Sequence, residues 1–224
     1  MFVGGIVATW RAPKPSIRSG ILHLAAGVVF SVVGIELLPD VLHRQAPFEA
    51  VIGFALGIVL MFSIKEWTRR LSATRRAGAG ELPMGMIVAI GVDILIDGLL
   101  LGIGFAAGAK QGTLLAFALA GEFVPLGLAT ATELGQAGMT KNKAMTLITG
   151  LALLVVVGGF IGGVFLPGLA SNLMELVLSF GVAALLFLVT EELLNEAHEQ
   201  AETPLLTSMF FVGFLVFMVL GMAE

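Results

Sequence analysis

Long apolar stretches alternate with short polar stretches along the whole chain. Seven of them, at about 19–38, 48–66, 84–107, 112–134, 144–166, 172–194 and 204–222, approach the ~20 residues that an α-helix needs to cross a bilayer. A shorter apolar stretch at 1–10 is expected to be a short or truncated first helix. The pattern predicts an all-α integral membrane protein with eight transmembrane helices.

Composition strengthens this prediction. Hydrophobic residues make up 58% of the 224 residues and charged residues only 12%, about half the charged share of an average soluble domain. The chain has no cysteine, which excludes disulfides and thiolate metal ligands. The loops contain no nucleophile–base pair or cofactor motif, so we expect neither an enzyme nor a nucleic-acid-binding protein, but a protein whose surroundings are membrane lipid.

Lysine and arginine predict the orientation. The polar segments 11–18, 65–76 and 141–143 hold all but two of the twelve basic residues, and Arg44 and Lys110 are the exceptions. Loops rich in these residues face the cytoplasm. We therefore expect a multi-pass protein of the inner (plasma) membrane with a single domain, 1–224. Its parts are helices one to three (1–66), a cytoplasmic loop (67–83), central helices four and five (84–134) and helices six to eight (144–224).

The sequence also repeats itself. Residues 36–40 read Glu-Leu-Leu-Pro-Asp and residues 192–196 read Glu-Leu-Leu-Asn-Glu, and a histidine follows each closely. The central stretches share a second pattern, Asp-x-x-x-Asp-Gly-Leu from residue 93 and Glu-x-x-x-Leu-Gly-Leu from residue 122. The expected topology gives the two copies opposite directions. This predicts a 3+2+3 inverted-repeat bundle, in which a substrate binds near the midplane.

Three acids lie where a bilayer would place its middle. Asp93 and Asp97 are four residues apart, so they share one helix face, and antiparallel packing brings Glu122 to a similar depth. Ionisable residues inside a span are functional candidates, and three neighbouring carboxylates would repel one another unless a cation neutralised them. Pro125 has no N–H, which leaves the carbonyl of Gly121 as an extra oxygen ligand. Such ligands suit Mg²⁺, Mn²⁺ and similar ions, whereas zinc more often takes imidazole or thiolate as well.

Other polar residues near the helix ends are candidates for a transport pathway. They are Glu36 and Asp40 on the outer side, and Glu133, Glu191, Glu192 and His198 on the inner side. The alternative for these acids is an ordinary solvated interface, and the histidines His23, His43 and His198 are expected at the interface rather than as ligands. For the central triad the alternative is hydrogen bonding that joins two helices. The glycine pairs at 158–159 and 162–163 predict close helix packing.

These motifs resemble the ZIP family of divalent-metal transporters over nearly the whole chain. When Gly98 and Gly127 are placed on the glycine of the family's His-Asn/Asp-x-Pro-Glu-Gly type motif, Asp93, Asp97 and Glu122 occupy ligand positions. The endings at 36–40 and 192–198 resemble those of the family's helices two and seven. Three apolar residues, Ile94, Phe123 and Leu126, stand where many members have further ligands.

The resemblance implies a transporter that carries divalent cations (zinc, manganese, iron or cadmium) into the cytoplasm, with the ion as cargo. A homodimer is one assembly left open. Two other functions use the same residues. In a proton-coupled carrier of a small organic solute, the carboxylates would relay protons. A membrane metal sensor would bind ions without moving them.

Overall fold

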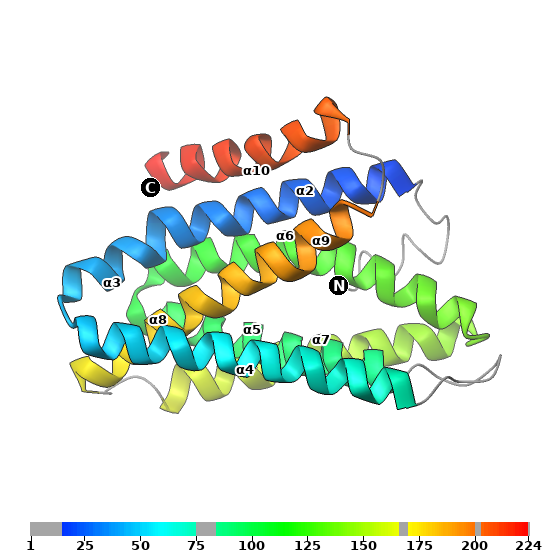
Figure 1. Cartoon of the computed structure of the whole chain (residues 1–224), viewed down its shortest axis with the longest axis horizontal. Coiled ribbons are helices and arrows are strands. Elements are labelled where there is room, and N and C mark those ends of the chain that lie inside the picture. Colours follow the sequence, from blue (N-terminus) through cyan, green and yellow to red (C-terminus); the bar gives the residue numbers. More distant parts are fainter. Residues whose placement is uncertain (1–14, 75–83, 166–169, 200–202, 224) are drawn as a thin grey trace.

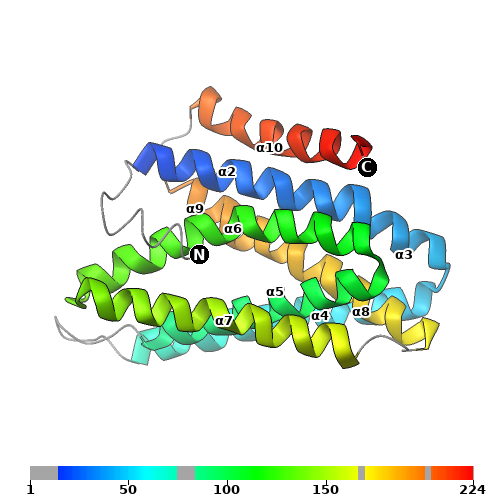
Figure 2. The ribbon, with the colours of Figure 1, turned by 180° about the vertical axis from the view of Figure 1, so that it is seen from behind.

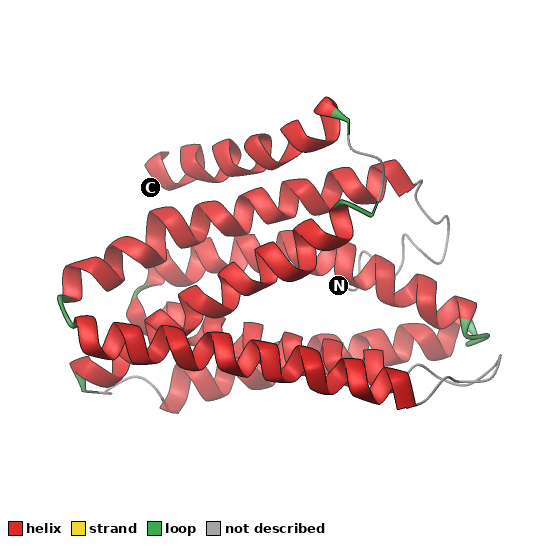
Figure 3. Ribbon diagram, viewed as in Figure 1, coloured by secondary structure: helices red, strands yellow, loops and turns green. Residues whose placement is uncertain are grey.

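The computed structural model describes residues 15–74, 84–165, 170–199 and 203–223 (Figure 1). Within these ranges every element is a helix and there is no strand (Figure 3). The helical rods are α2 (Pro15–Val32) continued by η1 (Val33–Leu37) and α3 (Leu38–Arg44); α4 (Pro47–Thr74); α5 (Met84–Ala107); α6 (Ala109–Gln136); α7 (Lys141–Phe165); α8 (Ser171–Phe187) continued by η2 (Leu188–Leu193) and α9 (Leu194–Ala197); and α10 (Pro204–Ala223).

Six of these rods are long and apolar enough to cross a membrane. The exception is α6, so the span expected at 112–134 forms a helix but is not among these six. Large apolar side chains also remain exposed along α4, α7 and α10, for example Phe48, Phe160 and Phe211. Apolar surface on this scale is typical of helices that face lipid. The chain is therefore all-helical and has the character of a multi-pass membrane protein. The first helix expected at 1–10 lies outside the described residues.

The rods form a bundle in which some helices are buried among the others and some lie at the periphery. α10 packs against α2, α4 against α8, and α5 against α7 (Figures 1 and 2). In its most apolar window, the α8 rod is 67% buried and the α2 rod 56% buried, whereas α4 is 17% and α10 only 11% buried. The α8 rod crosses between α2 and α4, so the α2 and α8 rods are core elements and α4 and α10 cover them.

Two helix ends differ from the sequence prediction. The second span does not stop near Pro39 but continues to Arg44, because a π-helical turn immediately precedes that proline and Pro39 falls in the first turn of α3, where a missing N–H is tolerated. The third span continues through residues 67–74, which were expected to open a loop. Ion pairs of 2.7 Å from Glu66 to both Arg69 and Arg70 support this extension.

The same π-helical turn occurs in both Glu-Leu-Leu segments. In η1 the N–H of Leu38 donates to the carbonyl of Val33, and in η2 the N–H of Leu194 donates to the carbonyl of Val189. Both bonds span five residues, and both turns end at the leucine that follows the glutamate. Turns of this kind are rare and frequently lie at functional sites.

Basic residues gather at one end of the bundle. That end, where α2 begins and α4 ends, is called the basic end below. Arg44 and Lys110 lie at the opposite end, and six other cations lie at the basic end: Arg18, Lys65, Arg69, Arg70, Lys141 and Lys143. The described basic residues therefore follow the distribution that the alternating loops predicted.

Glycines hold α5 and α7 in close backbone contact. A Cβ added to Gly158 or Gly162 would lie 2.4 Å from a backbone carbonyl oxygen of α5, and one added to Gly98 or Gly102 would lie 2.4 Å from a carbonyl of α7. Small residues allow backbones to approach in this way. The prediction of close packing is confirmed for Gly158 and Gly162, and this contact fixes the helix that carries Asp93 and Asp97.

Candidate metal site

A one-residue connection determines how the central acids meet. Gly108 alone separates the end of α5 from the start of α6, so the two helices run antiparallel from that point. At a rise of 1.5 Å per residue, Asp93 and Glu122 both stand about 20 Å from this turn. Their equal depth is thus a consequence of the hairpin.

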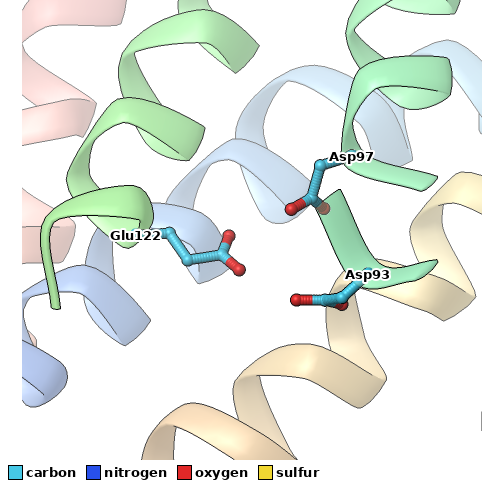
Figure 4. A group of neighbouring side chains, drawn as sticks. All are labelled: Asp93, Asp97 and Glu122. Atoms are coloured by element: carbon cyan, nitrogen blue, oxygen red, sulfur yellow. The ribbon is translucent and has the colours of Figure 1, made fainter. Parts of the chain in front are cut away.

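The carboxylates of Asp93, Asp97 and Glu122 face one another across the α5–α6 hairpin (Figure 4). One oxygen from each side chain lies within 4.8 Å of the others. Asp97 is 3% exposed and Glu122 is 2% exposed, while Asp93 is half-buried. Three groups that carry like charge when ionised therefore converge in a site with little access to water.

Two oxygens in this cluster lack hydrogen bonds. Oδ2 of Asp97 and Oε2 of Glu122 are buried and find no hydrogen-bond partner among the described residues. A buried carboxylate without a partner costs several kcal/mol. The alternative that the acids join two helices through hydrogen bonds does not account for these two oxygens, whereas a bound cation would.

The size of the cluster suits one ion. Two oxygens bound to the same small divalent cation at about 2.1 Å can be at most about 4.2 Å apart. The observed limit of 4.8 Å exceeds this by a fraction of an ångström, which side-chain rotation can close. The cluster is therefore slightly open and wide enough to admit a cation.

The surroundings of the cluster are partly apolar. Ile94 is fully buried, and Phe123 and Leu126 pack against the hydrophobic cluster that contains it. These are the three positions where the family resemblance would have allowed further ligands. Around the triad they supply no metal-binding atoms, so the described ligands fit one ion rather than a pair.

A fourth carboxylate approaches from η2. Glu192 lines a cavity of about 210 Å³ together with Asp93, Lys65 and Met61, and it interacts electrostatically with all three acids of the triad. The cavity lies between the triad and the basic end. The ammonium of Lys65, which lines it, lies 2.6 Å from Oε2 of Glu191, the residue before Glu192. The cavity thus connects the site with charged residues of the basic end.

Apolar packing closes the opposite side. Leu37, Leu100, Ile103 and Leu115 are each no more than 6% exposed, and the space that they enclose with neighbouring residues measures about 10 Å³. This is at the lower limit for a single water molecule. Access to the triad in this structure is therefore from the basic end.

The other predicted site residues lie apart from the triad. Gly121 precedes Glu122 in α6, and its role as a carbonyl ligand stays a prediction. Glu36 has an oxygen 3.6 Å from the position of a Cβ added to Gly221, so it faces α10. Asp40 stands in α3 at the opposite end. Glu133 and His198 are exposed at the basic end.

Sequence reasoning missed Glu175. This residue of α8 is fully buried near the opposite end, where it accepts a hydrogen bond of 3.2 Å from Ser179 and lies 3.9 Å from Nε of Arg44. It also interacts electrostatically with Asp40 and Glu49. Its position inside an apolar stretch, four residues before a serine on the same face, was the available signal.

No protein-family model and no curated protein matches this sequence. The ZIP resemblance therefore depends on the motifs within the chain.

Proposed function

We propose that this chain is a membrane transporter that moves divalent transition-metal cations, such as Mn²⁺, Fe²⁺, Zn²⁺ or Cd²⁺, toward the basic end. Asp93, Asp97 and Glu122 would bind the ion near the midplane. The observation that carries the proposal is the buried cluster itself, whose oxygens lie within 4.8 Å of one another while one oxygen each of Asp97 and Glu122 lacks a partner among the described residues. A cation supplies the missing interaction.

Internal similarity supports alternating access as the mechanism. The π-helical turns that end at Leu37 and Leu193 lie in rods of opposite direction. Beside them, Glu36 faces Gly221 of α10, and Glu192 shares a cavity with Met61 of α4. Corresponding neighbouring helices in opposite orientations are what an inverted repeat would produce, and transporters built from such repeats bind substrate where the repeats meet.

The pathway follows from the position of the charged residues. Glu36 and Asp40 would attract the cation on the outer side, and Glu133, Glu191, Glu192 and His198 would guide it out on the inner side. The cavity beside Asp93 and the apolar packing at the opposite side correspond to an inward-facing state. If the basic end is cytoplasmic, transport is into the cytoplasm across the inner (plasma) membrane.

Uptake into liposomes tests the proposal. Purified protein would be reconstituted, and uptake of Mn²⁺, Fe²⁺, Zn²⁺, Cd²⁺ and Mg²⁺ compared for the native chain and for Asp97→Asn. We expect flux of at least one transition-metal ion, and its loss in the variant. Glu66→Gln is the matched control, because it removes a carboxylate that is paired with arginines outside the site and should leave flux unchanged.

Other outcomes would favour the alternatives. Binding of metal without flux would replace transport by sensing. Flux of an organic solute that depends on pH and not on metal would make the carboxylates proton relays. Native flux in Asp97→Asn would remove the central site from the pathway.

A further inference from the structure

Two of the three histidines in the chain meet at the basic end. His23 lies in α2 and His198 directly follows α9, and their ring centroids are 5.2 Å apart in an edge-to-face arrangement. The third histidine, His43, lies at the opposite end. The fold therefore brings together two imidazoles that are distant in sequence.

A hydrogen bond orients the buried ring. Nδ1 of His23 lies 2.9 Å from the carbonyl oxygen of Ser19, and a carbonyl only accepts, so Nδ1 carries a proton. In the neutral ring, which is the form that binds metal, Nε2 then has the lone pair. It is buried and has no hydrogen-bond partner within the described part of the chain, and His23 as a whole is 2% exposed.

This arrangement resembles the outer support of a metal-binding histidine. Such a histidine commonly donates its second ring N–H to a carbonyl, which fixes the tautomer and aims the remaining nitrogen. Ser19 also contacts the segment that carries His198, because its hydroxyl donates to the carbonyl of Ala197 at 2.8 Å. One residue of α2 thus holds His23 and anchors the backbone next to His198.

The distance between the rings fits one shared ion. Two imidazoles bound to a tetrahedral ion through bonds of 2.0–2.1 Å have centroids about 5 Å apart, and the observed separation is 5.2 Å. Carboxylates lie at the same end of the bundle: Glu196 forms an ion pair with Arg18, and Glu133 interacts electrostatically with Arg18, Glu196 and Glu199. Among the described residues, none of them joins the two histidines in a group of three close ligands, so water would complete the coordination shell.

We infer that His23 and His198 form a second metal site, which binds a borderline divalent ion such as Zn²⁺, Co²⁺ or Cu²⁺ through nitrogen. The inference rests on the proposed function for the kind of cargo. The inference gives the two sites different ligand atoms, because the central triad offers only oxygen and the histidine pair offers nitrogen. Ions that accept imidazole are held at this second site before release, and hard ions such as Mg²⁺ are not.

Pulsed electron paramagnetic resonance of Cu²⁺ bound to the purified protein tests the site. Copper has the highest affinity of the divalent first-row ions, and its spin-echo modulation detects the remote nitrogen of a bound imidazole. We expect this modulation in the native protein and its loss in His198→Ala, which changes an exposed residue. His23→Ala should have the same effect, and gel filtration would show whether that buried substitution preserves the fold.

His43→Ala is the matched control. His43 also lies near the carbonyl four residues before it, at 2.7 Å from Pro39, but the described residues place no second imidazole beside it. Modulation that persists in His198→Ala, or that disappears only in His43→Ala, would overturn the inference. Asp97→Asn separates the two proposals, because it should abolish Mn²⁺ uptake and leave the nitrogen signal intact. A nitrogen signal without metal flux would refute the transport proposal alone.

Discussion

Replacing Gly158 with alanine tests whether the close contact of α5 and α7 positions the candidate metal site. The new Cβ would lie 2.4 Å from the carbonyl oxygen of Leu95, 2.8 Å from the backbone nitrogen of Leu99 and 3.0 Å from the carbonyl carbon of Gly98. All three atoms belong to backbone and cannot rotate away. Ordinary contact begins at 3.4 Å, so the helices must separate by about 1 Å, which costs about 1–3 kcal/mol.

The neighbouring glycine provides the control. A Cβ on Gly159 would lie 3.6 Å from the nearest atom of α5, an ordinary contact. Alanine there should therefore keep the gain of up to about 1 kcal/mol that alanine brings to a helix. The same gain partly offsets the cost at Gly158. We expect the two variants to differ by about 2 kcal/mol, with Gly158→Ala the less stable.

The effect on transport should be larger than the effect on stability. Gly98 follows Asp97 directly, so a displacement of α5 moves that carboxylate relative to Glu122, and metal–ligand distances tolerate only about 0.2 Å. Thermal unfolding in detergent and uptake into liposomes would be measured for both variants. Equal stability and equal uptake in Gly158→Ala and Gly159→Ala would refute the idea that this interface sets the geometry of the site.

Two further substitutions test the electrostatics of the site. Glu122→Gln should leave the metal-free protein as stable as the native one or more so, because it removes a buried carboxylate whose Oε2 has no hydrogen-bond partner among the described residues. If the proposed site binds metal, the substitution should also abolish the stabilisation of about 2.7 kcal/mol expected at an ion concentration 100 times Kd, as measured by thermal shift. Lys65→Met should tighten Mn²⁺ binding about three- to tenfold at fixed ionic strength, because an ammonium leaves the cavity beside Asp93. Calorimetry would show this, and the exposed Lys143→Met should bind as the native protein does.

Helix positions were predictable because a bilayer imposes a length. Backbone polar groups in hydrocarbon must be satisfied within the segment, so an apolar stretch of about 20 residues has few alternatives to a helix. The three central acids were predictable for a related reason. Their spacing of four and the antiparallel hairpin fix their face and depth, whatever the rest of the bundle does.

Residues outside the hairpin were harder to place. The rods that carry His23 and Glu175 are apolar on all sides, so the hydrophobic pattern does not reveal which face is buried against protein and which faces lipid. Contacts decide it: the side of α2 that carries His23 packs beside the α8 rod, and Glu175 meets Arg44 from another helix. The sequence placed Lys65 in a basic polar segment. It lines the cavity because α4 continues as a helix beyond it.

The π-helical turns were also beyond sequence reasoning, and they determine where the glutamates of the two Glu-Leu-Leu segments lie. An extra residue in one turn changes the register of the helix that follows, so the side chains after it point in directions that an uninterrupted α-helix would not give. In η2 this turn holds Glu192 against the cavity that reaches Asp93. In η1 the corresponding glutamate, Glu36, faces α10, and leucines such as Leu37 close the space beside it. The π-helical turn thus lies next to a cavity in one rod and next to packed side chains in the other, which is the asymmetry that a single state of the proposed alternating-access transporter would require.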